Sequence, residues 1–183
     1  PAWPQRLARG VRLHRRVDSW TDAHPLALQA RRRFEPPFRR YAGVLLDVWF
    51  DHLLARDFER WSDGESLRAF ADRCHGVLLR AVTTPTAIAW PPAFVVYVHR
   101  LARHDGIVAY ADAAHAEAVL ERIGQRLRRA NPLGVALPVL ESLQGPLQRD
   151  FEGFMPELIG FARAEGAGPG PARSGSVERD VDP

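Results

Sequence analysis

Apolar residues recur with helical spacing along most of the chain, and no hairpin pattern interrupts them. Pro, Gly, Asp and Asn mark the breaks between the periodic stretches. The pattern predicts helical segments over residues 4–18, 24–34, 37–57, 65–82, 91–104, 112–130 and 132–164. We expect the last segment to be two or three shorter helices, broken or kinked near Gly145-Pro146 and Met155-Pro156, because proline lacks a helix-forming amide.

The final residues differ from the rest in composition. Residues 165–183, EGAGPGPARSGSVERDVDP, are rich in Gly, Pro, Ser and charge. Such a segment cannot bury enough apolar surface to offset its ordering entropy. We therefore expect an all-α, single-domain helical bundle over residues 1–164 and a disordered tail over 165–183.

Two acidic residues interrupt an otherwise apolar helix. On a helix over residues 41–58, YAGVLLDVWFDHLLARDF, apolar side chains point in nearly every direction. This pattern is typical of a helix that is buried on all sides. Asp47 and Asp51 are i and i+4 and share one stripe, whereas His52 lies roughly 100° from Asp51. Buried carboxylates become protonated, pair with cations or bind a metal. The partner of Asp47 and Asp51 can be either arginine from a neighbouring helix or a metal ion.

A second polar cluster lies in residues 11–25, VRLHRRVDSWTDAHP. On a helix, His14 and Asp18 fall at i and i+4 beside the apolar arc, which we expect to face the core. Imidazole and carboxylate in that position can share a divalent ion or simply form a hydrogen bond. The three arginines Arg12, Arg15 and Arg16 occupy the opposite arc.

The stretch SWTDAHP is typical of a helix start. Ser19, Thr21 or Asp22 can cap the free amides, and Pro25 suits the first turn. Capping is the expected role of Thr21. Asp22 can instead orient a water or a phosphate beside Asp18, and His24 is open to the same two interpretations.

Composition narrows the partners and the compartment. All 25 basic residues are arginine against 22 acidic ones, which gives a net charge of +3 and a pI near 9.7. Guanidinium suits phosphate, so a phosphorylated substrate or an acidic partner is expected. The arginines form no long basic stripe with interleaved aromatics, so we do not expect the protein to bind nucleic acid. With one cysteine, no signal peptide and no apolar run of about 18 residues, we expect no intrachain disulfide, no membrane and a cytoplasmic location.

The two polar stretches together resemble the acyl carrier protein phosphodiesterases, also called acyl carrier protein hydrolases, a divergent branch of the HD-domain phosphohydrolases. A His-Arg-Arg-hydrophobic-Asp helix followed by Thr-Asp and Pro, then a Leu-Asp helix with an Asp-His pair, occur there in the same order. Looser similarity continues to about residue 164. The family normally opens with a helix rich in His and Leu and a short aspartate motif. The sequence begins after both, so we expect a preceding segment.

The resemblance implies an HD-domain-like fold and manganese-dependent removal of 4'-phosphopantetheine from holo acyl carrier protein. It places the family's polar motif residues on His14, Arg15, Arg16, Asp18, Thr21, Asp22, Asp47, Asp51 and His52. Among these we expect His14, Asp18, Asp51 and His52 at the metal, and Asp22, Asp47, Arg15 and Arg16 in catalysis. Other divalent cations also suit mixed imidazole and carboxylate ligands.

Two alternatives share some of these features. One is an HD-like phosphohydrolase of a nucleotide or another small phosphoester, which would use the same metal site without a protein partner. The other is a non-catalytic helical module that binds an acidic protein, with Asp47 and Asp51 neutralised by arginine. The oligomeric state is not predicted by the sequence.

Overall fold

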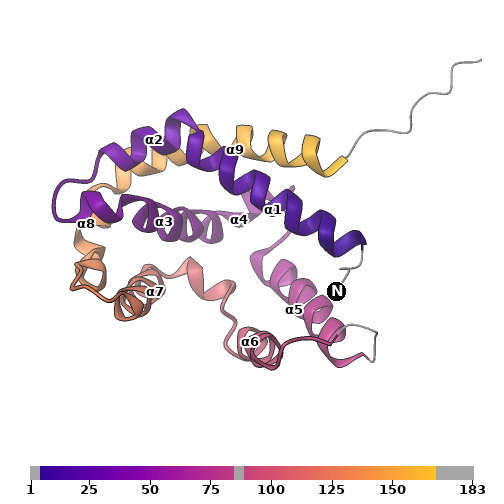
Figure 1. Ribbon diagram of the computed structural model, residues 1–183. Helices are drawn as coiled ribbons and strands as arrows, with labels where there is room; N and C mark the ends of the chain where they lie inside the picture. The colour runs from indigo at the N-terminus through magenta and orange to yellow at the C-terminus, as the bar shows by residue number, and fades with distance from the viewer. Residues whose placement is uncertain (1–4, 85–88, 168–183) are drawn as a thin grey trace, which may run out of the picture.

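The computed structural model describes residues 5–84 and 89–167, and every regular element in these ranges is helical (Figure 1). The elements are α1 (Gln5–Ala23), α2 (Pro25–Arg32), η1 (Phe38–Tyr41), α3 (Ala42–Arg56), α4 (Phe58–Trp61), α5 (Leu67–Thr83), α6 (Pro92–Arg103), η2 (Val108–Ala111), α7 (Ala113–Arg126), η3 (Leu133–Val135), α8 (Leu137–Ser142) and α9 (Gln144–Ala167). The expected single all-α domain is confirmed.

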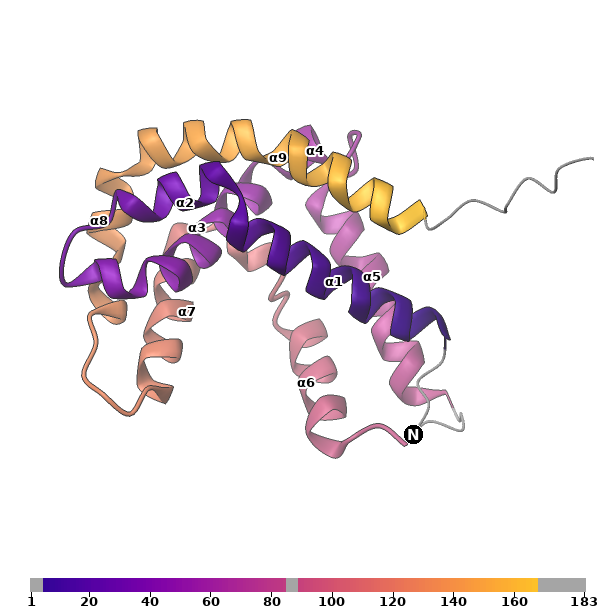
Figure 2. The ribbon, with the colours of Figure 1, turned by 45° about the horizontal axis from the view of Figure 1, so that its top comes forward.

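Helix α3 lies at the centre of the domain, with α2 and α9 on one side and α7 on the other (Figures 1 and 2). Its apolar side chains form the middle of the core, where Trp49 and Leu53 are almost fully buried. They pack with Phe34 after α2, Leu120 of α7 and Phe151 of α9. Because α3 packs against several elements at once, the core fixes its orientation.

Helix α9 runs antiparallel to α2 and to the part of α1 that leads into it (Figure 2). Near its start, Asp150 accepts hydrogen bonds from Gln29 and Arg33 of the α2 region, at 2.8 and 2.7 Å. Near its end, Glu165 pairs with Arg16 of α1 at 2.6 Å. These polar contacts set the register of α9 on α1 and α2, and the apolar contacts below them bury its inner face.

The junction between α1 and α2 differs from the expected one. Helix α1 continues through Thr21 and Asp22 to Ala23, so neither residue caps α2, and the Ser19 hydroxyl donates back to a carbonyl within α1. The N-cap is His24, whose Nδ1 accepts from the Leu26 amide at 3.3 Å. Buried against Trp20 and Phe154, its ring gains packing that a smaller capping side chain would not supply.

The prolines of the last segment act differently from one another. The chain breaks at Leu143, just before Gly145-Pro146, as expected. At Pro156, in contrast, α9 is continuous, so the expected break there is wrong. The residues just before it, Phe154 and Met155, are buried in the core, and this packing outweighs the loss of one backbone hydrogen bond.

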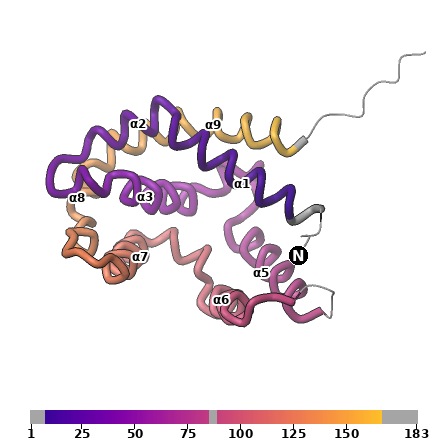
Figure 3. Tube along the Cα trace, in the orientation of Figure 1, coloured from indigo at the N-terminus to yellow at the C-terminus, as the bar shows by residue number. Residues whose placement is uncertain are grey.

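Helices α5 and α6 pack mainly on each other and stand apart from the core (Figure 3). In these two helices only Ala71, His75 and Val98 are buried. The chain leaves α3 through α4 into α5, and returns from α6 through η2 to α7. This excursion places α5, α6 and η2 opposite the end of α3.

Two further expectations concern the C-terminal tail and the absence of a membrane-spanning helix. Helix α9 includes residues 165–167, which were expected to belong to the tail, and the remaining tail residues, 168–183, lie outside the described residues. None of the described helices combines the length and the hydropathy that a membrane crossing requires.

Candidate functional site

One stripe of α3 is open to solvent, although the helix was expected to be buried all round. Asp47 and Asp51 lie on it and are solvent-accessible, so their expected burial is wrong. The reason is physical: apolar positions fill the other directions of α3, and the carboxylates occupy a direction that the described helices leave partly open to solvent. Gly43 precedes them by one turn on the same stripe.

Beside Asp51 the surface is hollowed into a cleft of about 440 Å³. Helix α3 contributes Asp51 and Leu54, α5 contributes Phe70, and Tyr97 and Tyr110 come from α6 and η2. Ala55, Phe58, Leu67, Leu101, Gly106 and Ile107 complete the lining. The cleft is therefore apolar, with one carboxylate and two tyrosines as its polar groups.

The carboxylates of the stripe carry raised pKa values. The pKa of Asp51 is raised to about 6, first because surrounding protein displaces water from the carboxylate and second because Asp47 adds a like charge. The pKa of Asp47 is raised as well, again mainly by desolvation. Both side chains thus remain accessible to solvent while their ionised forms are poorly solvated. A bound cation would relieve this cost.

Groups from α1 and α2 approach the same stripe. Asp22 of α1 pairs with Arg31 of α2 at 2.5 Å, and the Arg31 guanidinium lies over Gly43. The charges of Asp22 and Asp18 raise the pKa of Asp47, and the charge of Arg31 lowers it. Four carboxylates from two helices therefore lie in one region with the half-buried guanidinium of Arg31.

The position of His14 and Asp18 corrects one expectation. They form an i, i+4 pair at 3.5 Å, but their side chains are 76% and 57% exposed, so they do not face the core. The inner side of α1 is formed instead by half-buried Leu13, Val17 and Trp20. The pair therefore lies at the open edge of the acidic region, with Asp18 close enough to affect Asp47.

The two arginines of the motif have different surroundings. Arg16 pairs with Glu165 of α9, and so faces away from α3. Arg15 is exposed and lies seven residues before Asp22, which places both on nearly the same side of α1. Of the two, Arg15 is the one that the helix turns toward the acidic region.

His52 is buried next to the cleft, and its side chain contacts the backbone of Tyr110, a residue that lines the cleft. Its Nδ1 donates to the backbone carbonyl of Tyr110 at 2.9 Å, and its ring packs on Trp49 at 4.8 Å between centroids. A carbonyl that accepts from Nδ1 fixes the tautomer, which leaves the Nε2 lone pair available. This is the outer hydrogen bond that metal-binding histidines commonly make.

Two residues near the site were missed by the sequence analysis. Arg31 is largely buried, and its Nε has no hydrogen-bond partner in the described part of the chain. Its position one residue after buried Ala30, within the run Arg31-Arg32-Arg33, is the only sequence signal for it. Tyr110 lines the cleft, and desolvation followed by the charge of Asp51 raises its pKa. Nothing local in the sequence indicates that tyrosine.

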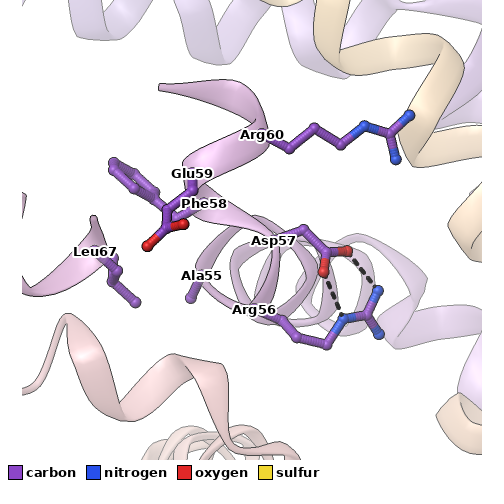
Figure 4. A pocket seen from close by; sticks show the side chains of 7 residues that line it. All are labelled: Ala55, Arg56, Asp57, Phe58, Glu59, Arg60 and Leu67. Atoms are coloured by element: carbon purple, nitrogen blue, oxygen red, sulfur yellow. Dashed lines mark hydrogen bonds and ion pairs between the residues drawn. The ribbon is translucent and has the colours of Figure 1, made fainter. Parts of the chain in front are cut away.

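A second hollow, of about 500 Å³, lies beyond the end of α3 (Figure 4). Among its charged groups, Asp57 pairs with Arg56 at 2.7 Å, and Arg60 points away toward Glu152 of α9. There the hydrogen bond from Arg56 outweighs desolvation and lowers the pKa of Asp57, whereas desolvation raises the pKa of Asp51 in its cleft. The Asp51 cleft is therefore the better candidate for chemistry.

A different set of side chains forms a group with metal-ligand spacing. Ligand atoms of Asp72, His75 and Asp105 lie within 4.8 Å of one another, and no other group of three His, Cys, Asp or Glu residues in the described ranges meets this spacing. None of the three was predicted. The expected ligands His14, Asp18, Asp51 and His52 do not form such a group in the described structure.

Comparison with known proteins identifies relatives over most of the chain. Residues 1–158 match the sequence model of the family described as acyl carrier protein phosphodiesterase. A protein of that name from Photorhabdus laumondii is 31% identical over 150 residues, which cover 82% of this chain and 73% of the relative. Another, from Salmonella paratyphi A, is 30% identical over 87% of this chain and 80% of the relative. No solved structure matches, so the HD-domain likeness stays a prediction.

Proposed function

Because the chain belongs to the acyl carrier protein phosphodiesterase family, we propose that it hydrolyses the phosphodiester linking 4'-phosphopantetheine to its serine on holo acyl carrier protein. The products are the apo carrier and 4'-phosphopantetheine. The observation that carries this proposal is the acidic stripe of Asp47 and Asp51, which ends at an apolar cleft and receives Asp18 and Asp22 from α1.

The acidic region is of the chemical type that attracts a divalent cation. Four carboxylates lie in the region beside the guanidinium of Arg31, and desolvation raises the pKa values of Asp47 and Asp51, so a cation would stabilise their ionised forms. We propose that His14, Asp18, Asp51 and His52 hold the ion. Manganese is the expected metal, and other divalent cations suit the same oxygen and nitrogen ligands. When bound, it would stabilise charge on the phosphoryl oxygens and lower the pKa of a bound water.

The remaining groups orient the substrate and its proton. Arg31 and Arg15 are the guanidiniums placed to contact the phosphodiester, and Asp22 positions Arg31 through their 2.5 Å contact. Asp47 is the candidate general base, since its raised pKa brings it closer to neutrality than an ordinary aspartate. The apolar cleft holds the pantetheine arm, which keeps bulk water away from the reacting phosphate.

The proposed partner is acidic in this family, and α1 presents arginine beside the site. Arg12 and Arg15 are exposed on that helix. They would attract an acidic carrier protein from solution, so association should weaken as salt increases. Free phosphoesters carry less charge than the acidic surface of the carrier, so they would gain less from this attraction.

The test is the mass of the carrier after incubation with this protein, with Mn²⁺ or with a chelator. Loss of the phosphopantetheine mass only in the presence of metal is the expected result. Asp51→Ala should abolish that loss, because it removes a proposed metal ligand. Asp63→Asn is the matched control, since Asp63 is an 84% exposed aspartate that pairs with Arg163 far along the chain from this stripe.

The other outcomes separate the alternatives. An unmodified carrier together with hydrolysis of a small phosphodiester would favour the HD-like phosphohydrolase of small molecules. Binding of the carrier without turnover, equal with metal and with chelator, would favour the non-catalytic module. Full turnover by Asp51→Ala would remove Asp51 from the catalytic site.

A further inference from the structure

The second group of metal-ligand side chains joins α5 to the loop that follows α6. Asp72 and His75 are i and i+3 on α5 and so lie on one face of that helix. Asp105 is brought to them from the loop between α6 and η2, where its φ of 48° turns the chain sharply. One atom from each residue lies within 4.8 Å of the other two.

His75 gives the independent indication that a ligand belongs here. Its side chain is only 6% exposed, and its buried Nε2 has no hydrogen-bond partner among the described residues. A buried imidazole nitrogen without a partner costs free energy that most proteins avoid. The two carboxylates beside it supply the negative charge that a cation requires.

Arg68 is the cation that these carboxylates contact in the structure. Its NH1 lies 2.7 Å from Asp105 and 3.7 Å from Asp72. The Arg68 side chain is 52% exposed, so it can move into solvent without leaving a cavity. Arg68 satisfies the carboxylates but makes no bond to the imidazole, and a metal ion would satisfy all three groups.

We propose that Asp72, His75 and Asp105 form a binding site for a first-row transition-metal dication of the Zn²⁺ or Co²⁺ type. One imidazole nitrogen and two carboxylate oxygens are ligands that such ions accept, with water completing the coordination. With metal–ligand bonds of about 2.0–2.1 Å the ligand atoms would be roughly 3.3 Å apart, so the group closes slightly on binding. The accessible Asp72 and Asp105 carboxylates permit this movement.

The site's place in the fold assigns it a structural role. Leu67 and Phe70 of α5 line the Asp51 cleft, and so does Gly106, the residue after Asp105. A metal bound to this group would therefore fasten α5 to the loop within one wall of the cleft. This proposal does not depend on the proposed catalytic metal, since it uses none of its ligands.

Cobalt binding tests the proposal directly. The Asp51→Asn protein removes a ligand of the proposed catalytic site, so its saturable Co²⁺ visible absorption reports this group. We expect binding that Asp72→Asn weakens by a factor of about 10 or more, because loss of even an outer hydrogen-bond partner of a ligand commonly costs that much. Asp72 is exposed, so this variant should fold, and Asp63→Asn should bind as the parent does.

Arg68 supplies the sharper comparison. Because Arg68 competes with the metal for both carboxylates, Arg68→Gln should tighten Co²⁺ binding several-fold. Zn²⁺ at about 100 times its Kd should raise the Tm of that variant by roughly 5–10 °C. Absence of a Co²⁺ spectrum at millimolar metal, binding only after Arg68 is replaced, or binding insensitive to Asp72→Asn would each overturn the proposal, whatever the carrier assay shows.

Discussion

Asp51→Asn should make the metal-free protein more stable near neutral pH. In the folded protein the pKa of Asp51 is about 6, because the surrounding protein displaces water from the carboxylate and Asp47 adds a like charge. The unfolded chain restores the ordinary value of about 3.9. Ionised Asp51 therefore lowers the stability of the folded protein. Asparagine has nearly the same shape and no charge, so it does not lower the stability in this way.

The magnitude follows from the two pKa values. The full difference corresponds to roughly 3 kcal/mol at pH 7. Asp51 keeps accessible surface, so solvent screening reduces the expected gain to about 1 kcal/mol. For a protein of this size that gain raises the Tm by roughly 2–4 °C.

The direction of the Asp51 pKa shift also determines how the stability of the protein depends on pH. A raised folded-state pKa means that the folded protein holds the proton more tightly, so the wild type loses stability as pH rises from about 4 to about 6. The gain from Asp51→Asn should be absent near pH 4 and complete above pH 6.5. Urea unfolding in chelator at several pH values measures it, with Asp63→Asn, expected within about 0.5 kcal/mol of wild type, as control. A variant less stable than wild type at pH 7 would show that the carboxylate is solvated or paired, which refutes the reasoning.

Two other aspartates should behave in the opposite way. Asp150→Ala should lower the free energy of unfolding by about 2–4 kcal/mol in urea unfolding, because Asp150 is buried and accepts hydrogen bonds from Gln29 and Arg33, which would lose their partner. At Asp57, a hydrogen bond from the Arg56 guanidinium lowers the pKa, so its ionised form stabilises the fold above the ordinary pKa and this stabilisation is lost as pH falls. Asp57→Asn should therefore cost less than about 1 kcal/mol at pH 7 and nothing at pH 2 by the same measurement, since the side chain is one-third exposed.

The helical spacing predicted most elements, because periodicity records which side of each helix packs. It also placed Asp47 and Asp51 on one stripe, and that part is confirmed by their shared exposure on α3. The burial of the stripe was wrong, since apolar residues in nearly all directions do not reveal which direction the fold leaves uncovered. The two carboxylates were themselves the signal for the open side.

Errors around α1 have a related cause. The arc of His14 and Asp18 borders the apolar side, and only the position of α9 decides that the core contact falls on Trp20 instead. The sequence pattern predicted Thr21 as the cap of α2, but the buried imidazole of His24 occupies the junction and caps that helix instead.

Arg31, Tyr110 and the group at His75 were beyond sequence reasoning for a different reason. Each acquires its role from residues that are distant in the sequence: Arg31 from Asp47, Tyr110 from Asp51, and His75 from Asp105. Spacing rules report neighbours on one helix. They do not report which helices meet, and that meeting creates the candidate site.

The unequal anchoring of the two cleft walls has a consequence for how a substrate enters. Asp51 stands on α3, whose side chains fill the core, whereas α5 and α6 contribute none to the main core cluster among the described residues. Segments with few buried contacts open at a lower free energy than the whole domain. We therefore expect the α5–α6 pair to open at a lower free energy than the core, while the acidic groups on α3 keep their arrangement.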